Sequence, residues 1–596
     1  MSYPIEQIRH SAAHVMAAAI QILFPQAKFG VGPAIDNGFY YDIDIGRALT
    51  PEDLKDIQKA MQKLANKKIA FERQEMSIDD AIALFEKLGQ PFKVELLNAI
   101  KTKGTTKLTA EEAEDVDPAM QGKVSIYKTG EFVDLCRGPH VEDSSAIGSF
   151  KINRMAGVYW RGDEKNPQLQ RVYGLCFATQ EELDAYEKMI EEAKRRDHKI
   201  LGPALDLFTF SDLVGPGLPL WTPKGTILRN LLDEFVWSLR SMRGYEKVEI
   251  PHITKKELYE VSGHWEKYQN DLFKITSREG HEFAMKPMNC PHHTQIYARK
   301  LWSYRELPQR YANTTMCYRD EQTGELSGLS RARSFTQDDA HVFCRMQQAK
   351  EEFLKIWDIV YEFYAVFGFK LQVRLSSHDP AAPQKYLGDP AMWEKAEGML
   401  KEIIAEKGVE ALDGMGEAAF YGPKLDFMAK DSIGREWQVA TIQLDMNMPE
   451  RFKLVCVNEN GEQETVVMIH AAIMGSIERF LSIAIEHYAG AFPLWLSPVQ
   501  VAILPVADRH IDASRKLADK FTEQGMRVEV DDTPESVGKK IRGAEVKKTP
   551  YMIVFGDKEL ESGQLTVRKR GIQEQAVEDT DALLARLKKD IETRAA

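Results

Sequence analysis

Two histidines and a later cysteine–histidine pair are the first residues whose types and spacing could do chemistry together. His10 and His14 lie four residues apart in a segment with helical periodicity, so they share one face of a helix. Cys136 and His140 flank a Gly-Pro pair that excludes a continuous helix, and we expect them on a loop that closes a β-hairpin turning at Gly130. The four side chains fit a zinc site or a metal-free pocket in which histidine activates water, and buried structural histidines are a third interpretation.

A second group lies along one predicted strand. Alternate positions carry an aromatic ring, an amide, a carboxylate and an imidazole: Phe335, Gln337, Asp339 and His341. Because neighbouring side chains of a strand alternate between its faces, all four point the same way over roughly 20 Å. The row could hold one elongated ligand, with a ring at one end and a metal ligand at the other.

Two further residues could complete a metal site with His341. Cys290 stands beside a proline at the edge of a strand or the start of a helix, and His470 ends an apolar strand. One cysteine and two histidines leave the fourth tetrahedral position open, which is the pattern of a catalytic rather than a structural zinc. Spacing alone does not reveal this triad, because its members lie far apart in the sequence.

The tract from Gly475 to Arg479 follows His470 and enters an amphipathic helix. A Gly-Ser approach followed by arginine suits a phosphate contact, because the guanidinium offers a planar fork of donors. An ordinary helix start is the alternative interpretation.

The elements that position these residues fall into three blocks, 1–195, 196–492 and 493–596, which agrees with the three to four domains expected for about 600 residues. The first block opens with an amphipathic helix from Glu6 to Leu23 and ends in a charged connector helix. The second mixes long strands with helices. The third alternates strand and helix, which predicts a small α/β domain with a mostly parallel sheet.

Composition excludes several classes of protein. With 43% hydrophobic and 28% charged residues, the chain is neither disordered, collagen-like nor stapled by disulfides. No apolar run reaches the roughly 18–20 residues that span a bilayer, no signal peptide is visible, and six scattered cysteines fit a reducing cytoplasm. The net charge of −12 argues against binding nucleic acid by bulk charge, but residues 539–570 hold nine basic side chains against four acidic ones, a local face of +5.

These motifs together resemble those of class II aminoacyl-tRNA synthetases. Residues 225–251, 319–341 and 475–479 match their motifs 1, 2 and 3. The tracts MKPMNCP, FTQDDAH, FYGPK and GSIERF are close to those of the bacterial threonyl-tRNA synthetase family, and the resemblance covers nearly the whole chain. Members commonly begin with an extra small domain, which we expect this chain to lack. His292 stands where that family usually has glycine, so a competing role as a metal ligand stays open.

The resemblance implies an α+β multidomain fold: an α/β editing domain, a class II catalytic domain on an antiparallel sheet, and a C-terminal α/β anticodon-binding domain. It implies ATP-dependent ligation of L-threonine to tRNA(Thr) through threonyl-adenylate, with hydrolysis of mischarged seryl-tRNA(Thr). The implied cofactors are one Zn²⁺ per chain and Mg²⁺ with ATP, and motif 1 implies a homodimer. The alternatives are another class II synthetase such as a prolyl enzyme, a non-catalytic RNA-binding paralogue, and a stand-alone editing hydrolase.

The resemblance also implies roles for individual residues of the catalytic block. Those that contact ATP or the tRNA acceptor end are Arg319, Glu321, Arg331, Phe335 and Arg479. Those that line the threonine pocket are Gln337, Asp339, Tyr421, Gln438 and Gln443. The zinc ligands are Cys290, His341 and His470. Lys424 would assist activation, and His264 would assist transfer to the tRNA ribose.

Two smaller sets belong to the outer blocks. The family's editing pocket, which works through water and so favours the metal-free interpretation, matches His10, His14, Asp134, Cys136 and His140. Its base-reading positions in the anticodon-binding domain match Glu559 and Arg568. That match favours a functional role for the basic face.

Overall fold

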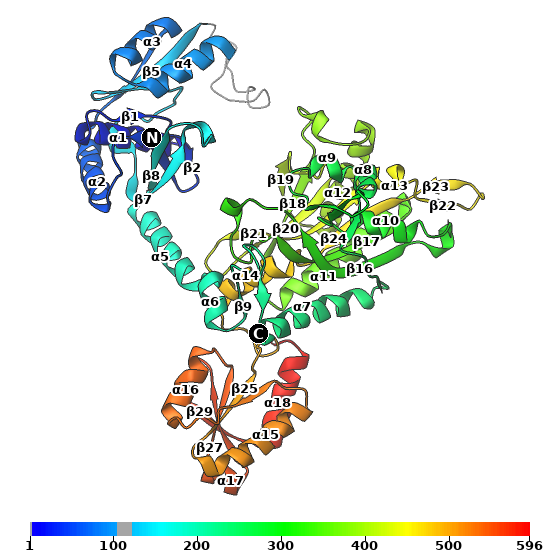
Figure 1. The fold of residues 1–596 in the computed structure, drawn as a ribbon. Helices are drawn as coiled ribbons and strands as arrows, with labels where there is room; N and C mark the ends of the chain where they lie inside the picture. Colours follow the sequence, from blue (N-terminus) through cyan, green and yellow to red (C-terminus); the bar gives the residue numbers. More distant parts are fainter. Residues whose placement is uncertain (1–2, 104–121, 596) are drawn as a thin grey trace. The chain divides into compact units, whose positions relative to one another are not determined.

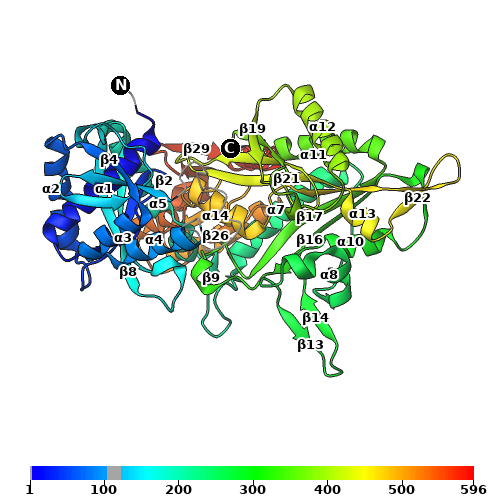
Figure 2. The ribbon, with the colours of Figure 1, turned by 90° about the horizontal axis from the view of Figure 1, so that it is seen from above.

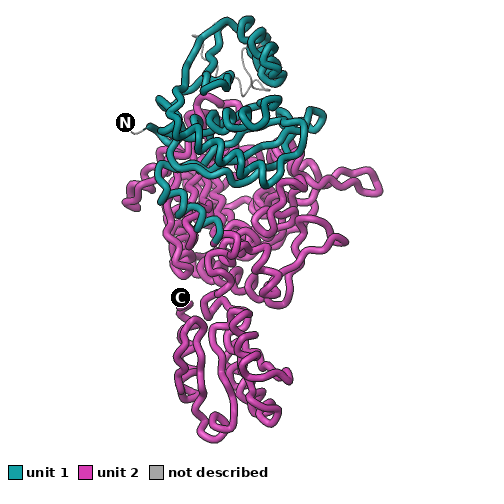
Figure 3. Tube along the Cα trace, turned by 90° about the vertical axis from the view of Figure 1, so that its left-hand side faces the viewer, with its two compact units in different colours: residues 1–191 teal, residues 192–596 magenta. Residues whose placement is uncertain are grey.

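The computed structural model describes residues 3–103 and 122–595. The chain folds into two compact units, residues 1–191 and 192–596 (Figure 3). Within the described residues, no helix combines the length and the apolar character that crossing a membrane requires.

Unit 1 pairs helices with two antiparallel sheets (Figure 1). Its helices are α1 (Ile5–Leu23), α2 (Pro51–Asn66), α3 (Ile78–Lys87), α4 (Pro91–Lys103) and α5 (Gln180–Arg196), the last of which continues into unit 2. Its strands are β1 (Lys28–Phe29), β2 (Ala34–Ile35), β3 (Gly38–Asp44), β4 (Phe71–Ser77), β5 (Lys123–Thr129), β6 (Phe132–Leu135), β7 (Ser149–Tyr159) and β8 (Gln168–Phe177). One sheet has the order β1-β3-β8-β7 with β2 paired to β3, and the other has the order β4-β5-β6.

Helix α1 packs against the first sheet of unit 1. Its buried face is rich in alanine, which lets the helix backbone lie close to the aromatic side chains Phe39 and Tyr41 of β3. The hairpin of β5 and β6 turns at Gly130, whose φ of 65° favours glycine, as the sequence predicts. The chain then leaves β6 through the loop of Cys136 and His140.

The core of unit 2 is an eight-stranded sheet of order β11-β16-β17-β24-β21-β20-β18-β19, antiparallel except at its two edge pairs. Its strands are β11 (Glu246–Lys247), β16 (Gln309–Tyr318), β17 (Ser334–Cys344), β18 (Leu371–Ser377), β19 (Ala411–Met415), β20 (Lys424–Lys430), β21 (Glu436–Asp445) and β24 (Val467–Ala472). Three helices pack on one face of this sheet: α7 (Pro223–Ser241), α11 (Met346–Ala365) and α14 (Ile477–His487). Figure 2 shows this part of the chain from above.

The remaining elements of this part surround the sheet. The helices are α6 (His198–Ala204), α8 (Lys256–Ser262), α9 (His264–Lys267), α10 (Cys290–Tyr297), α12 (Pro390–Lys407) and α13 (Asn447–Arg451). The strands are β9 (Phe208–Thr209), β10 (Leu220–Trp221), β12 (Ile253–Lys255), β13 (Lys274–Thr276), β14 (Glu282–Met285), β15 (Trp302–Ser303), β22 (Val455–Val457) and β23 (Gln463–Thr465).

The register of the central sheet sets one transverse row of side chains. His341 of β17 lies directly opposite His470 of β24, which lies opposite Gln443 of β21. Gln443 in turn lies opposite Lys424 of β20. Because directly opposed residues share a face of the sheet, residues far apart in the sequence meet on the face away from the three helices.

A buried ion pair on the helix-covered face holds this register. Arg240 of α7 pairs with Asp338 of β17, and both side chains are at most 2% exposed. Asp338 also accepts the backbone N–H groups of Ile473 and Met474, at 2.9 and 3.0 Å, just beyond β24. One carboxylate therefore joins α7, β17 and the end of β24.

The C-terminal part of unit 2 has a five-stranded sheet of order β26-β25-β27-β28-β29. Its strands are β25 (Val501–Pro505), β26 (Val528–Val530), β27 (Tyr551–Phe555), β28 (Gln564–Lys569) and β29 (Gln575–Asp579). Its helices are α15 (Ile511–Glu523), α16 (Val537–Val546), α17 (Asp557–Ser562) and α18 (Thr580–Glu592).

The prediction of a mostly parallel C-terminal sheet is wrong for its second half. β26, β25 and β27 are parallel, but β28 and β29 pair antiparallel. A parallel crossover needs about a dozen residues or more, and only residues 556–563 separate β27 from β28. The chain therefore has to return antiparallel.

We expect Arg240→Met to destabilise unit 2 strongly, because it leaves the Asp338 charge buried without its partner. Breaking a buried pair in this way costs on the order of 3–5 kcal/mol of the free energy of unfolding. The matched control is Arg243→Met, whose partner Glu362 is 48% exposed, so its loss should cost under about 1 kcal/mol. Urea denaturation of both variants measures the difference, and equal losses would contradict the central role of Arg240.

Candidate functional site

The structure brings Cys290, His341 and His470 together. Cys290 is the first residue of α10, and the two histidines face each other on β17 and β24. Their Sγ and ring nitrogen atoms all lie within 4.8 Å of one another, and all three side chains are buried. Nε2 of His341 and Nδ1 of His470 lie 3.1 Å apart.

Two residues that the sequence analysis missed hold these histidines from behind. Nδ1 of His341 lies 2.8 Å from Nδ1 of His293, and Nε2 of His470 lies 3.0 Å from Oδ2 of Asp445. His292, for which a competing ligand role stayed open, is outside the group that could hold a metal ion. No spacing signal marked His293 or Asp445, because both act through the ligands.

The protonation of this group suits a metal ion. Burial lowers the pKa of His341 well below its usual value, so its imidazole is neutral and offers a lone pair. Burial also raises the pKa of the Cys290 thiol well above its usual value, so the thiolate needs a cation beside it. One thiolate and two imidazoles form a donor set that zinc accepts, with a fourth position open.

The row continues from His470 into polar side chains of β21 and β20. Tyr421 stacks on the ring of His470 with a centroid distance of 4.9 Å, and its hydroxyl lies 2.5 Å from Oε1 of Gln443. Asp339 lies on the same face as His341 and accepts a hydrogen bond from Nδ2 of Asn289 at 3.1 Å. Amide, hydroxyl and carboxylate groups thus line one surface beside the thiol and imidazoles.

A fully buried carboxylate organises the far end of the row, and sequence reasoning missed it. The carboxylate of Asp426 accepts hydrogen bonds from Nζ of Lys424, at 2.6 Å, and from Nε2 of Gln438, at 2.8 Å. It also accepts the hydroxyl of Ser376 at 2.7 Å. Lys424 and Gln438, both candidates from the sequence, are therefore held by one partner.

The arginines expected at ATP lie at the ends of β16 and α14. The Arg319 guanidinium lies 5.2 Å from the ring of Phe335, and its buried Nε has no hydrogen-bond partner within the described part of the chain. Arg331 forms an ion pair with Glu321 at 2.7 Å. Arg479 lies in the first turn of α14, where its backbone N–H bonds the capping Ser476. The unpartnered Nε of Arg319 is suited to an anionic ligand.

His264, expected near the tRNA ribose, is fully buried beside the metal-ligand group. Its Nε2 is 3.8 Å from Sγ of Cys290, and its Nδ1 is 2.8 Å from the hydroxyl of Ser262. Burial lowers its pKa to about 3, so it is neutral near pH 7. Gln337 lies on β17 between Phe335 and Asp339, with Oε1 3.7 Å from Sγ of Cys317.

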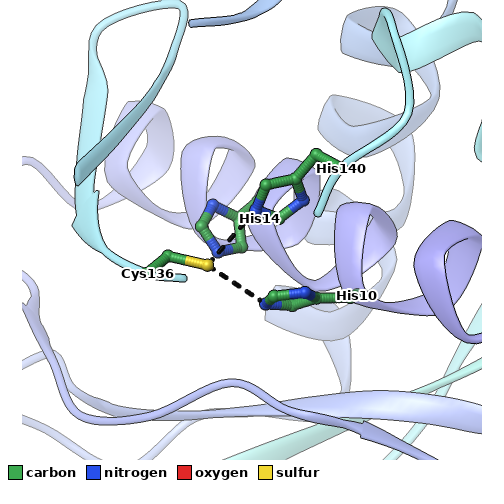
Figure 4. A group of neighbouring side chains, drawn as sticks. All are labelled: His10, His14, Cys136 and His140. Carbon is green, nitrogen blue, oxygen red and sulfur yellow. Dashed lines mark hydrogen bonds between the residues drawn. The ribbon is translucent and has the colours of Figure 1, made fainter. Parts of the chain in front are cut away.

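A second cluster lies in unit 1, where α1 faces the loop after β6 (Figure 4). Sγ of Cys136 lies 3.3 Å from Nε2 of His10 and 3.3 Å from Nε2 of His140. One ligand atom from each of these residues and from His14 lies within 4.8 Å of the others. The structure thus brings together all four residues that the spacing pointed to.

Burial keeps this quartet uncharged. It lowers the pKa of His140 to about 2 and that of His14 well below its usual value. It raises the pKa of the Cys136 thiol to about 12. Near neutral pH the pocket therefore presents neutral imidazoles and a thiol, which can orient water or a hydroxyl group.

Two further residues, Lys93 and Tyr41, surround Asp134, the acidic candidate of this pocket. Lys93 of α4 forms an ion pair with Asp134 and bonds the hydroxyl of Tyr41 at 3.1 Å. Tyr41 donates its hydroxyl to Asp134, and Nε2 of His14 lies 3.5 Å from the same carboxylate. All of these side chains are buried. A lysine in a helix is most often exposed, so the sequence offered no signal for Lys93.

The two base-reading candidates differ in their surroundings. Glu559 is 8% exposed, and its carboxylate accepts the N–H of Gly556 at 2.9 Å and the hydroxyl of Thr566 at 2.5 Å. Arg568 of β28 is half-buried, and its side chain has no hydrogen-bond or ion-pair partner among the described residues. Arg568 thus keeps its donors free for a ligand.

Part of the basic face has a structural role. Lys540 is buried and donates to the carbonyl of Pro505 at 3.2 Å. Arg570 donates to the carbonyl of Phe492 at 2.7 Å. These two side chains support the fold, so the charge offered to a partner is smaller than the sequence count of +5.

Comparisons with known proteins agree with this arrangement. Residues 273–488 match the model of the tRNA synthetase class II core domain (G, H, P, S and T). Residues 500–590 match an anticodon binding domain, and residues 124–173 match the threonyl and alanyl tRNA synthetase second additional domain.

Curated relatives and solved structures are also aminoacyl-tRNA synthetases. The threonine–tRNA ligase of Cytophaga hutchinsonii is 47% identical over 94% of this chain and 85% of its own length. That of Gloeobacter violaceus is 47% identical over 95% and 89%. A crystal structure titled as the RNA binding domain of threonyl-tRNA synthetase from Cryptosporidium parvum matches with a TM-score of 0.63 and 34% identity, over 66% of this chain and 98% of that one.

The two ligases match 94% and 95% of this chain and 85% and 89% of their own lengths. The class II core model spans most of the central sheet, all three metal-ligand candidates and Arg479. The chain therefore belongs to the threonine–tRNA ligase family of class II aminoacyl-tRNA synthetases.

Proposed function

We propose that this protein joins L-threonine to tRNA(Thr) through threonyl-adenylate and hydrolyses mischarged seryl-tRNA(Thr). The observation that carries the proposal is the open group of Cys290, His341 and His470 at the end of a polar row, in a chain whose relatives are named threonine–tRNA ligases. A prolyl-like synthetase or a non-catalytic paralogue is not favoured by those relatives.

Membership of the family implies ATP-dependent chemistry that needs Mg²⁺, with tRNA, ATP and an amino acid as partners. We assign editing to residues 1–195, activation and transfer to 196–492, and anticodon binding to 493–596. We also propose a homodimer built around residues 225–251. Leu213, 99% exposed before α7, and Met242, 72% exposed just after it, are apolar side chains that a partner would cover. The six free cysteines suit a cytoplasmic enzyme.

Activation requires a carboxylate to attack the α-phosphorus of ATP while pyrophosphate leaves. Arg319 and Arg479 would hold the phosphates with charged, forked donors, and Phe335 would stack on the adenine. Glu321 would accept the adenine amino group, and Arg331 would turn toward the nucleotide or the acceptor end. Lys424, steadied by Asp426, would place a positive charge near the reacting phosphate. His264 would assist the later attack of the ribose hydroxyl on the threonyl carbonyl.

Selection of threonine follows from the donor groups of the pocket. When held by Cys290, His341 and His470, a zinc ion would supply a Lewis-acid site for the amino and hydroxyl groups of threonine. Gln337, Asp339 and Tyr421 would bind the rest of the amino acid, with Gln438 and Gln443 along the wall. Valine lacks the hydroxyl, but serine lacks only a methyl group, which is worth about 1–3 kcal/mol, or roughly 10–200-fold. Such discrimination is too weak for translation, so a second, hydrolytic site is expected.

The unit 1 quartet suits that hydrolysis. Water must attack the seryl ester carbonyl, and the ribose oxygen must leave with a proton. His140, with a pKa of about 2, is too weak a base to take a proton, so it is better suited to accept a hydrogen bond from the water or the ribose hydroxyl. Lys93 and Asp134 would hold His14 and Tyr41 in place beside it. The extra methyl of threonine would displace the water.

The overall activity is tested by pyrophosphate exchange with threonine, serine, valine and proline as substrates.

We expect Cys290→Ala to lose bound zinc and threonine activation together, because two remaining ligands hold the ion too weakly. Lewis-acid assistance is worth several kcal/mol, so activation should fall at least about 100-fold. Zinc content is measured by atomic absorption on the folded protein. The control Cys344→Ala changes a buried cysteine of β17 outside the site and should keep its zinc. Parental activation by metal-free Cys290→Ala would exclude the zinc assignment.

For editing, we expect the double variant His10→Ala with His14→Ala to charge threonine at the parental rate but release stable seryl-tRNA. General acid–base assistance is worth about 10²–10⁴-fold, so deacylation of preformed seryl-tRNA should slow by that order. Threonine charging by the same preparation is the internal control. Unchanged deacylation, or an equal fall in charging, would reject the editing role, and metal found at the quartet would favour a metal-bound hydroxide as the nucleophile.

For anticodon binding, we expect Arg568→Ala to raise the KM for tRNA by about 5-fold or more and to leave tRNA-independent threonine activation unchanged. A bidentate arginine contact to a base edge is worth about 1–3 kcal/mol. The matched control is Arg586→Ala, in the same domain, whose guanidinium is already paired with Glu578. Equal damage to both reactions, or an equal effect of the control, would contradict the assignment.

A further inference from the structure

A buried histidine outside both sites uses each of its ring nitrogens. His198, the first residue of α6, is 4% exposed. Its Nδ1 lies 2.6 Å from Oε1 of Glu486, and its Nε2 lies 3.1 Å from the backbone N–H of Leu329. An N–H group can only donate, so Nε2 is the acceptor and Nδ1 carries the hydrogen. The two bonds fix a single neutral tautomer.

This cluster does not have the character of a cation site. Asp197, His198 and Glu486 place ligand atoms close together. However, the lone pair of His198 is used by Leu329, and the second oxygen of Glu486 lies 2.5 Å from Arg435. The backbone N–H of His198 also donates to Glu486, at 3.1 Å. The group is a hydrogen-bonded link between segments.

One end of the link is the loop between β16 and β17. Leu329 lies in this loop, and the ion pair of Arg331 with Glu321 closes it. Gly328 has a φ of +54°, and a Cβ at that position would lie 2.4 Å from Nε2 of His198. The loop backbone therefore passes directly against the imidazole, with no room for another side chain.

The other end of the link is α14. Glu486 lies seven residues, or about two turns, after Arg479 on the same helix. Arg319 stands at the start of the loop that Leu329 belongs to. One imidazole thus bridges the two elements that carry the arginines assigned to the ATP phosphates.

We propose that His198 is a positioning residue, which sets the β16–β17 loop relative to α14 and so determines the affinity for ATP. The proposal rests on the proposed function for its assignment of ATP to this loop. His198 itself touches no substrate, and its effect passes through the N–H of Leu329.

Three variants of His198 test its hydrogen bonds to Leu329 and to Glu486 separately. In His198→Gln the amide oxygen can reach the position of Nε2 and accept from Leu329, whereas in His198→Asn the amide nitrogen can reach the position of Nδ1 and donate to Glu486. His198→Ala loses both. We expect His198→Asn and His198→Ala to raise the KM for ATP in threonine-dependent pyrophosphate exchange by roughly 3–10-fold, the scale of one hydrogen bond. His198→Gln should stay near the parental KM, and the KM for threonine should not change.

Hydrogen exchange of the Leu329 amide gives a readout that does not depend on activity. Its exchange should accelerate in His198→Ala and His198→Asn and stay slow in His198→Gln. The matched control is His487→Ala, which removes a like bond from the N–H of Ser432 to a ring nitrogen, 3.1 Å long, and should change neither quantity.

Three results would overturn the proposal. The first is equal Leu329 exchange in all folded variants, and the second is faster exchange with an unchanged KM for ATP. The third is equal damage by the Gln and Asn variants, which would reduce His198 to a general packing role. If the parental enzyme failed to activate threonine at all, the proposed function would fail, while the exchange measurement would still report on the His198 bond.

Discussion

The strand register of the central sheet is the constraint on which the site depends. His341, His470, Gln443 and Lys424 come from four strands and meet only because each lies directly opposite the next. A slip of one residue in any of these strands would turn the residue that it contributes to the opposite face. The buried carboxylate of Asp338 prevents such a slip, because it is bound at once by Arg240 of α7 and by two N–H groups beyond β24. Asp338 therefore fixes the strand from the helix-covered face, and its sequence neighbour Asp339 lies on the opposite face with His341.

Both polar clusters use burial to set protonation. Desolvation keeps the imidazoles of His341, His14 and His140 neutral, so their lone pairs stay available. The clusters differ in what stands behind them. His470 is backed by the carboxylate of Asp445, as suits a residue that binds a cation. The unit 1 quartet has Asp134 beside it, but Lys93 pairs with that carboxylate, so the charges largely cancel. This difference supports a metal in one pocket and water in the other.

Sequence patterns predicted the local elements well where the hydrophobic periodicity and the positions of proline and glycine indicated the same boundaries. The helix ending before Pro25, the hairpin turning at Gly130, and the alternation from Phe335 to His341 all follow from short-range stereochemistry. The C-terminal sheet was predicted less well, because the direction of β28 depends on the length of a connection rather than on the pattern of the strand. The basic face was overestimated, because periodicity does not show that Lys540 and Arg570 bond carbonyl groups.

The sequence by itself determined the residue types of both sites, the family to which the chain belongs, and the strands and helices that carry the chemistry. Only the tertiary structure decided which residues support them: His293 and Asp445 behind the metal-ligand group, Asp426 beneath Lys424, Lys93 beside Asp134, and His198 under the β16–β17 loop. The physical reason is that hydrogen bonds and ion pairs join atoms across space. The sequence around a lysine or histidine therefore does not show whether its side chain is buried or exposed in the folded protein.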